Sequence, residues 1–290
     1  MYSKYDLNFS AGATKKIFLF SDLHIDSPLC DTKRLKQDLD MAVEQDGSIF
    51  INGDVFDFLL FRDFKRSTPT TQSTFNDDQI GTIIDNVYEF LKPYADRILG
   101  IGVGNHETSV LKYHHIDPIK MLIYRLEKEC SVIINHLGYT GFIRLNAVRQ
   151  GSTSYKSYDI WYHHGSGGGG KSKGIMQHND VASNFMADLY WMGHNHANIA
   201  DFDYPITYVN SKGKIETKNR MFARTAGYQR DDQHLPEDYK KRGYTLDWGK
   251  EKFLRHTSKG CQVLTLKLDR DQSNGKESVS IRSKLESGWN

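Results

Sequence analysis

Short apolar runs that stop at polar residues constrain the fold of this chain more than any other feature of its sequence. Three runs of strand length lie in the first half, at 16–20, 48–52 and 98–103. Two segments with apolar residues at helical spacing separate them, at 35–43 and 80–91. Because strands that alternate with helices pair in parallel, this half of the chain predicts an α/β fold.

Each of these runs leads directly into residues that can bind a metal or move a proton. The segments after them are Asp22-Leu23-His24, Gly53-Asp54 and Gly104-Asn105-His106-Glu107. Loops at the carboxyl ends of parallel strands are where this architecture places its functional sites. We therefore expect the functional site of the chain among these loops.

The second half is richer in strands. Strand-like runs occupy 139–145, 158–163 and 189–192, residues 261–268 alternate as a late strand, and a helix is predicted at Val181–Met186. We see no internal repeat and no linker that forces a domain boundary. The expectation is one domain over 1–290, with a motif-bearing core at about 14–200 and an insertion-rich part at 201–290.

Histidines also follow two strand-like runs of the second half. His163-His164-Gly165 ends one run, and Gly193-His194-Asn195-His196 follows the other. Imidazole nitrogens, carboxylate oxygens and amide oxygens together suit divalent metals of borderline hardness. A lone Asp-x-His or Gly-Asp is weak evidence for a metal site, because such residues often cap loops. Five such loops in one chain, each after an apolar run, argue for a shared metal centre.

In this order, the five blocks resemble those of the calcineurin-like metallophosphoesterase superfamily over roughly residues 16–200. The resemblance implies two mixed β-sheets packed as a sandwich and flanked by helices, in four layers. It also implies two divalent ions about 3.5 Å apart. Manganese is our first expectation, and iron, nickel, cobalt or zinc also suit these ligands. The tail from Gly227 to Val263 more loosely resembles phage and prophage members.

The resemblance also implies the role of each ligand. Asp22, His24 and His196 hold one metal, and Asp54 bridges both. Asn105, His194 and one histidine of the His163–His164 pair hold the second. Members with His-Gly at this point use the histidine before glycine, which favours His164, whereas members with His-His-Pro use the first one. His163 therefore stays open as the alternative.

For the reaction, the resemblance implies hydrolysis of a phosphoester by a hydroxide that bridges the two metals. His106 matches the catalytic histidine and is expected to act as general acid, with Asp57 orienting its ring. The second block continues with Phe58-Leu59, not with the Arg-Gly of the superfamily's protein phosphatases. We therefore expect a phosphodiester or nucleotide-type substrate. The alternatives are a nuclease module acting on nucleic acid within a complex, and a protein or phosphomonoester phosphatase.

A glycine-rich segment at 165–172 formally fits the phosphate-binding pattern G-x-x-x-x-G-K-[ST]. A nucleotide-binding loop would start a helix at once after the lysine, whereas Gly174 delays that start. We interpret the segment as a wall of the metal cleft, in which Lys171 contacts substrate phosphates. His115, shortly after His106, is the second residue that we expect to bind substrate.

Composition sets the remaining limits. The formal net charge is +2, from 38 basic and 36 acidic residues, so bulk charge does not predict a nucleic-acid binder. Three separated cysteines form no disulfide framework, which favours a reducing compartment. No hydrophobic signal core and no run near ~18 apolar residues is present. We expect a cytoplasmic enzyme with a phosphoester as partner and no membrane; the sequence does not indicate an oligomeric state.

Overall fold

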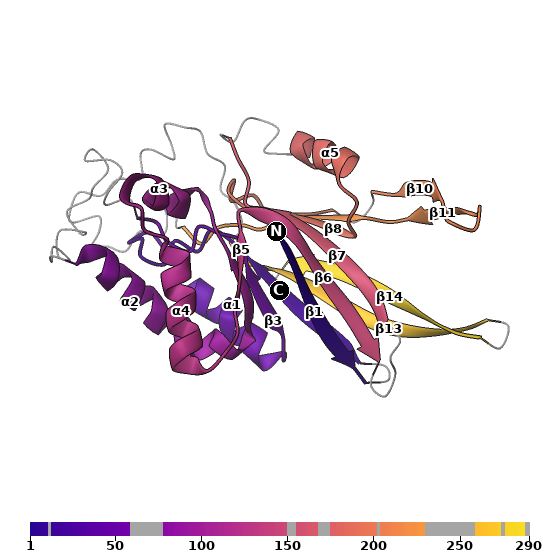
Figure 1. Ribbon diagram of the computed structural model, residues 1–290, viewed down its shortest axis with the longest axis horizontal. Coiled ribbons are helices and arrows are strands. Elements are labelled where there is room, and N and C mark those ends of the chain that lie inside the picture. The colour runs from indigo at the N-terminus through magenta and orange to yellow at the C-terminus, as the bar shows by residue number, and fades with distance from the viewer. Residues whose placement is uncertain are drawn as a thin grey trace.

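Two mixed β-sheets, each of six strands, form the centre of the molecule (Figure 1). The computed structural model describes residues 1–10, 13–58, 78–149, 155–167, 175–201, 204–229, 259–273 and 276–287. The sheets face each other, and helices cover their outer sides. The α/β sandwich flanked by helices that the sequence predicted is thereby confirmed.

Sheet I contains the three strands that the first half of the sequence predicted. Its strand order is β14 (Lys276–Ser287), β13 (Gln262–Ser273), β2 (Thr14–Phe20), β3 (Ser48–Ile51), β4 (Ile98–Gly102) and β5 (Asn135–Gly138). Strands β2 to β5 pair in parallel, whereas β13 pairs antiparallel with both β2 and β14. The carboxyl ends of β2, β3 and β4 consequently lie at one edge of this sheet.

Sheet II is built mainly from the second half of the chain. Its strand order is β1 (Tyr2–Phe9), β6 (Thr140–Arg149), β7 (Tyr155–His163), β8 (Leu189–Met192), β12 (Met221–Arg224) and β9 (Ile199–Asp201). Strand β8 pairs in parallel with β7 and with β12. The histidine-bearing loops after β7 and β8 therefore leave sheet II at the same edge. The hairpin of β10 (Ile206–Val209) and β11 (Ile215–Lys218) is a separate two-stranded sheet.

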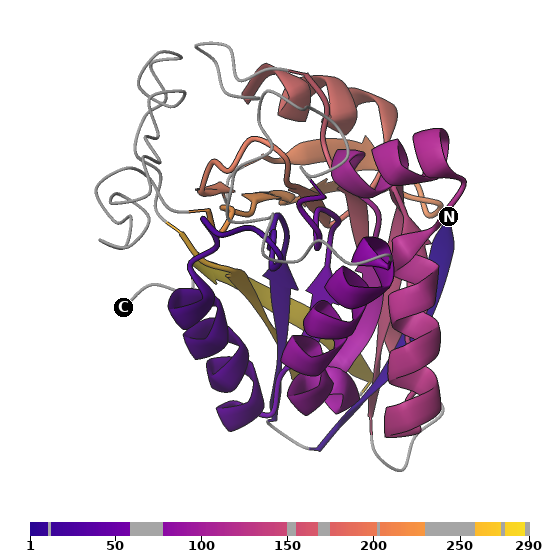
Figure 2. The same cartoon turned by 90° about the vertical axis from the view of Figure 1, so that its left-hand side faces the viewer.

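Helices form the two outer layers. Their bounds are α1 (Thr32–Glu44), α2 (Gln79–Leu91), the 3₁₀ helix η3 (Lys92–Arg97), α3 (Asn105–His114), α4 (Pro118–Cys130) and α5 (Ile175–Asn184). Helices α1, α2 and α4 lie side by side on the outer face of sheet I (Figure 2). No helix in the described ranges is both long and apolar enough to span a membrane.

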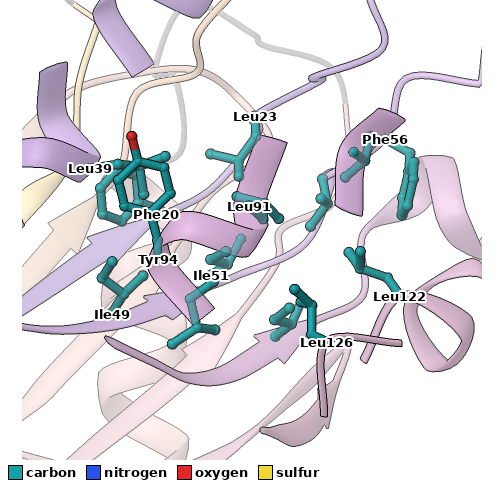
Figure 3. Close-up of a cluster of buried hydrophobic side chains, with 14 of the residues drawn as sticks. Phe20, Leu23, Leu39, Ile49, Ile51, Phe56, Leu91, Tyr94, Leu122 and Leu126 are labelled. Carbon is teal, nitrogen blue, oxygen red and sulfur yellow. The ribbon is translucent and has the colours of Figure 1, made fainter. Parts of the chain in front are cut away.

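Three apolar clusters hold these four layers together. Leu39 of α1, Leu91 of α2 and Leu126 of α4 pack against Ile49 and Ile51 of sheet I (Figure 3). The residues between the two sheets include Leu19, Phe50, Ile143, Ile160 and Trp191. Beyond sheet II, the third cluster packs Ala182 of α5 with Tyr190 and Phe222. Burying both faces of each sheet explains why the central strands are almost uniformly apolar.

Helix α5 corrects a sequence prediction. We expected a helix at Val181–Met186, whereas α5 spans Ile175–Asn184 and ends before Phe185. Polar residues occupy most of its first turns, so the apolar period is weak where the helix begins. Phe185 leaves the helix and stacks on Trp161 with ring centroids 5.0 Å apart, and Met186 is exposed. This packing on sheet II ends the helix earlier than the sequence pattern indicated.

Strands of the C-terminal part complete both sheets and return the chain to the predicted site. β12 lies inside sheet II, and β13 lies beside β2 in sheet I. After β12, the backbone N–H of Tyr228 donates to the Asp22 carbonyl (3.0 Å), and its hydroxyl donates to Asp38 Oδ2 (2.7 Å). Asp38 is buried on α1 and also pairs with Arg34 Nε at 2.9 Å. The segment after β12 is thus fixed against α1 and the first loop.

The Tyr228 hydroxyl provides a test of this attachment. We expect Tyr228→Phe to lower the free energy of unfolding by about 1–3 kcal/mol, because Asp38 then loses a buried hydrogen-bond donor. Tyr124→Phe is the matched control, since the Tyr124 side chain is 65% exposed, and its effect should stay within about 0.5 kcal/mol. Urea denaturation measures both values. Equal losses in the two variants would contradict the proposed attachment.

Candidate metal centre

Five loops meet where the strands of both sheets end. They follow β2, β3, β4, β7 and β8, and carry Asp22 and His24, Asp54, Asn105 and His106, His164, and His194 and His196. Backbone hydrogen bonds join them: Asp22 N to Gly53 O (3.0 Å), His24 N to Asp54 O (3.0 Å) and Gly193 N to His164 O (2.9 Å). The ends of both sheets therefore present their polar residues to one another.

Asp22, His24 and His196 form the first of two clusters. One donor atom from each lies within 4.8 Å of the other two, and Asp22 Oδ1 lies 3.3 Å from His196 Nε2. His24 Nε2 is buried without a hydrogen bond in the described part of the chain, 4.0 Å from Asp54 Oδ2. Leaving a buried polar atom unsatisfied is costly. A cation among these donors would remove that cost, so the residues fit a metal.

The second cluster contains Asp54, His164 and His194, again within 4.8 Å of one another. His164 Nε2 lies 3.1 Å from Asp54 Oδ2, and Asn105 Oδ1 lies 2.7 Å from His194 Nδ1 and 3.3 Å from His164 Nε2. The Asn52 carbonyl accepts from His164 Nδ1 at 2.7 Å. Because a carbonyl can only accept, Nδ1 carries the proton and Nε2 is left as a metal donor.

His163, the alternative to His164, points away from this cluster. Its Nδ1 accepts the Gly165 N–H at 2.8 Å. Its ring stacks on Trp161 (centroids 5.8 Å apart) and meets Tyr139 edge-on (5.2 Å). Of the two adjacent histidines, the geometry brings only His164 to Asp54.

Asp54 lies between the two clusters. Its Oδ2 is 3.1 Å from His164 Nε2 and 4.0 Å from His24 Nε2. Burial alone would raise the pKa of Asp54, but the charge of His164 holds this pKa far below its ordinary value. Asp22 behaves alike: burial opposes ionisation, yet His196 lowers the pKa of Asp22 to about 2. Two ionised carboxylates thus face each other in the interior, which requires positive charge between them.

Backbone strain concentrates at the same residues. Asp22, His24, Asp54, His194 and His196 all have φ between 46° and 70°, and they are five of the nine such non-glycine residues in the described part. A positive φ is uncommon for residues with a Cβ atom, and it persists where the surroundings impose it for function. A Cβ atom on Gly104 would lie 2.0 Å from Asp54 Oδ1, so only glycine allows the third loop to approach.

A third group contains His24, Asp57 and His106. His106 Nδ1 contacts the backbone carbonyl oxygen of Asp57 and lies 3.5 Å from Asp57 Oδ1, while His106 Nε2 lies 3.9 Å from Asp54 Oδ2. The Asp57 carboxylate is closer to His24, with Oδ1 3.1 Å from His24 Nδ1. The sequence analysis expected the side chain of Asp57 to orient His106, and the structure shows the Asp57 carbonyl as the nearer partner.

Several residues that were not expected to bind the metals or the substrate hold these loops in place. Buried Glu107 accepts the backbone N–H groups of Gly104 (2.8 Å), Asp54 (3.1 Å) and Phe56 (3.0 Å), and burial raises the pKa of Glu107 to about 6. Gln229 Nε2 donates to Asp57 Oδ1 at 3.4 Å. Asp26 could have been identified from the sequence, because it lies two positions after His24 in the first loop.

The structure describes one of the two expected substrate-binding residues, His115, and this residue lies outside these clusters. Lys171 lies outside the described residues. His115 is exposed at the end of α3, which places it about 15 Å along the helix from Asn105. The beginning of the glycine-rich segment does reach the clusters, because the Gly167 carbonyl oxygen lies 3.1 Å from His194 Nε2.

The fold and the two adjoining clusters define an α/β sandwich protein with histidine and aspartate groups able to hold divalent metal ions. The sequence matches no family model and no curated protein. Among solved structures it is similar to vacuolar protein sorting 29 from Cryptosporidium parvum, with a TM-score of 0.35 and 10% identity. The alignment covers 94% of this chain and 99% of that chain. A likeness this weak assigns neither a family nor an activity.

Two histidines of the clusters predict how pH affects the metal-free protein. Burial favours their neutral forms, but Asp57 raises the pKa of His24 to about 9, and Asp54 raises the pKa of His164 to about 10. Unfolded histidine titrates near 6.5, so the folded state holds the extra protons. Their contribution to stability is fully present below about pH 6.5 and is lost as pH rises through about 9–10.

We therefore expect the melting temperature of the metal-free protein to fall between pH 7 and 10. Asp54→Asn should flatten this decline, because it removes the charge that raises the pKa of His164. Asp78→Asn, at the start of α2, is the control and should keep the slope. Added Mn²⁺ should stabilise the protein most at high pH, where metals compete with fewer protons. A wild-type slope in Asp54→Asn would contradict this assignment.

Proposed function

We propose that the chain is a dinuclear metal-dependent phosphoesterase of the calcineurin-like type. The observation that carries the proposal is one buried carboxylate, Asp54, whose Oδ2 lies 4.0 Å from His24 Nε2 of the first cluster and 3.1 Å from His164 Nε2 of the second. Asp22, His24 and His196 would hold one ion, and Asn105, His164 and His194 would hold the other. Two ions bridged by a carboxylate are the arrangement used for in-line displacement at phosphorus.

The ions, when bound, would lower the pKa of a water molecule and neutralise the phosphoryl oxygens. The chain itself supplies the other parts of the mechanism. In the metal-free protein, histidine charges lower the pKa values of Asp54 and Asp22, so both carboxylates are already ionised before a metal binds. Gly104 and Glu107 hold the loop of Asn105 and His106 against Asp54. These contacts fix the donors before substrate binds, so little reorganisation is needed during the reaction.

His106 is the proton donor in this proposal. Its Nδ1 contacts a carbonyl oxygen, which requires a proton on Nδ1 and leaves Nε2 directed toward Asp54 and the clusters. The side chain is 17% exposed, so it lies at the edge of the buried groups and can reach a bound ester. Transfer of the Nε2 proton from the doubly protonated ring to the leaving oxygen would leave the neutral Nδ1–H ring, and it would contribute about 10²–10⁴-fold to the rate.

The charges around the clusters favour a phosphodiester. Among the described residues, the ion pairs of Asp22, Asp54 and Asp57 are with histidines. At the position after Asp57, where the superfamily's protein phosphatases have an arginine, this chain has Phe58. Phe58 is 3% exposed and stacks on Phe56 in the core, so it offers no charge to a substrate. A diester carries one negative charge, whereas a monoester carries nearly two and needs more positive charge to bind. We therefore propose a phosphodiester or nucleotide-type substrate over a phosphoprotein.

A metal-supplemented activity screen tests the proposal. The protein is assayed with Mn²⁺, Co²⁺, Ni²⁺ or Zn²⁺ against bis-p-nitrophenyl phosphate, p-nitrophenyl phosphate, cyclic nucleotides and DNA. We expect turnover of the diester with at least one metal, and loss of turnover with a chelator. A protein that binds these metals yet hydrolyses none of the esters would contradict the proposal.

Two variants assign the roles of the residues. His106→Ala should lower kcat on a diester with a poor leaving group by about 10²–10⁴-fold, because the leaving oxygen then departs without a proton. His114→Ala is the matched control, since His114 is exposed at the other end of the same helix. Asp54→Asn should abolish both turnover and binding of the second ion, which calorimetry with Mn²⁺ measures. Unchanged turnover in both variants would contradict the mechanism.

A further inference from the structure

One peptide group joins the proposed proton donor to a carboxylate of the first loop. The carbonyl oxygen of Asp57 contacts His106 Nδ1, and the N–H of the same peptide, on Phe58, donates to Asp26 Oδ2 at 3.0 Å. The other carboxylate oxygen, Asp26 Oδ1, accepts the Asp57 N–H at 2.6 Å. Asp26 thus accepts the N–H groups of two consecutive residues. The carbonyl oxygen of the Asp57–Phe58 peptide points toward His106.

A carboxylate that accepts the N–H of a peptide group changes how strongly the carbonyl oxygen of that group accepts a hydrogen bond. Hydrogen bonds in a chain polarise one another, so a negative charge on the N–H side makes the carbonyl oxygen a stronger acceptor. A stronger acceptor at Nδ1 holds the proton there and keeps Nε2 directed at the metal clusters. Asp26 is therefore placed to act on His106 through three atoms of the backbone.

We propose that Asp26 is a positioning residue for His106, acting through the Asp57–Phe58 peptide. This inference rests on the proposed function of His106 as proton donor. Asp26 fixes the tautomer and the orientation of the ring, and it does not touch the substrate. It takes the part that a carboxylate in direct contact with the ring plays in other acid–base pairs.

The contacts of His106 support a role of Asp26 beyond stabilising the loop. The Asp57 carboxylate, which could bind His106 directly, lies closer to His24 Nδ1 (3.1 Å) than to His106 Nδ1 (3.5 Å). The peptide oxygen is therefore the nearer partner of His106. Phe58 is held at φ 44°, a conformation that costs free energy for a residue with a Cβ atom. Asp26 stabilises the loop in this conformation.

The test uses Asp26→Asn, which keeps the size of the side chain but removes its charge and replaces one of its two acceptor oxygens with an amide donor. We expect kcat to fall by about 10–100-fold on a diester with a phenolate or alkoxide leaving group. With bis-p-nitrophenyl phosphate the fall should be less than about threefold, because nitrophenolate departs without a proton; KM should hardly change on either substrate. Asp117→Asn is the matched control, since Asp117 also accepts a backbone N–H, from Lys120 at 3.0 Å, far from the clusters. A uniform loss on both substrates would overturn the inference.

A second measurement does not depend on activity. Nitrogen-15 NMR of the His106 ring distinguishes a proton on Nδ1 from one on Nε2, in the wild type and in Asp26→Asn. We expect Nδ1–H in the wild type and a population shifted toward Nε2–H in the variant. Identical ring shifts would overturn the inference even in a protein that hydrolyses none of the tested esters. An inactive wild type with the expected shift would instead overturn the proposed function and leave the role of Asp26 standing.

Discussion

Buried negative charge is the constraint on which the rest of this structure depends. Asp22, Asp54 and Asp57 are each no more than 3% exposed, and they lie on loops from two neighbouring strands of sheet I. Carboxylates at such depth are unfavourable unless positive charge lies among them. Without a metal, the histidines supply it, which is why the pKa values of His24 and His164 are raised to about 9 and 10 despite burial. Divalent ions can replace those protons. The buried carboxylates, which are unfavourable without positive charge among them, would then contribute to the free energy of metal binding.

The fold satisfies this constraint by bringing the charged groups together at the strand ends of both sheets, not by placing them on a single loop. β2, β3 and β4 are parallel, so their carboxyl ends lie together, and the parallel pair β7 and β8 ends opposite them in sheet II. Side chains that are far apart in sequence consequently approach within hydrogen-bond distance, as Asn105 and His194 do at 2.7 Å. The positive φ values of Asp22, His24, Asp54, His194 and His196 show that the backbone is strained where these side chains turn toward the clusters. The packed sheets beneath the loops can hold that strain because both of their faces are buried.

Sequence reasoning was effective where a residue follows an apolar run, and less effective where partners come from distant segments. The strands at 16–20, 48–52 and 98–103 could be predicted from their apolar runs, and the candidate metal-binding residues directly after them from the order of the blocks. The resemblance favoured His164, the histidine directly before Gly165, but the sequence left His163 open, and the contacts after β7 bring His164 to Asp54. Gln229 was not found because its contact with Asp57 spans 172 positions and depends on the return of the chain after β12. Helix α5 was misplaced mainly at its start, because polar residues weaken the apolar period before Val181; at its end, Phe185 lies beyond the helix and stacks on Trp161.

The contacts around His106 join residues that are far apart in the sequence. Asp26 is two residues from His24, yet its partners are the N–H groups of Asp57 and Phe58, more than thirty positions later. In sequence, Asp57 has the position of the residue that orients His106, and the structure places its backbone there while its carboxylate lies nearer His24. A peptide can transmit the charge of Asp26 because its N–H and C=O bonds point in opposite directions in one rigid plane, so that their dipoles are aligned. The first loop would then contribute both a metal ligand and the group that orients the proton donor, which ties metal binding and acid catalysis to the conformation of one loop.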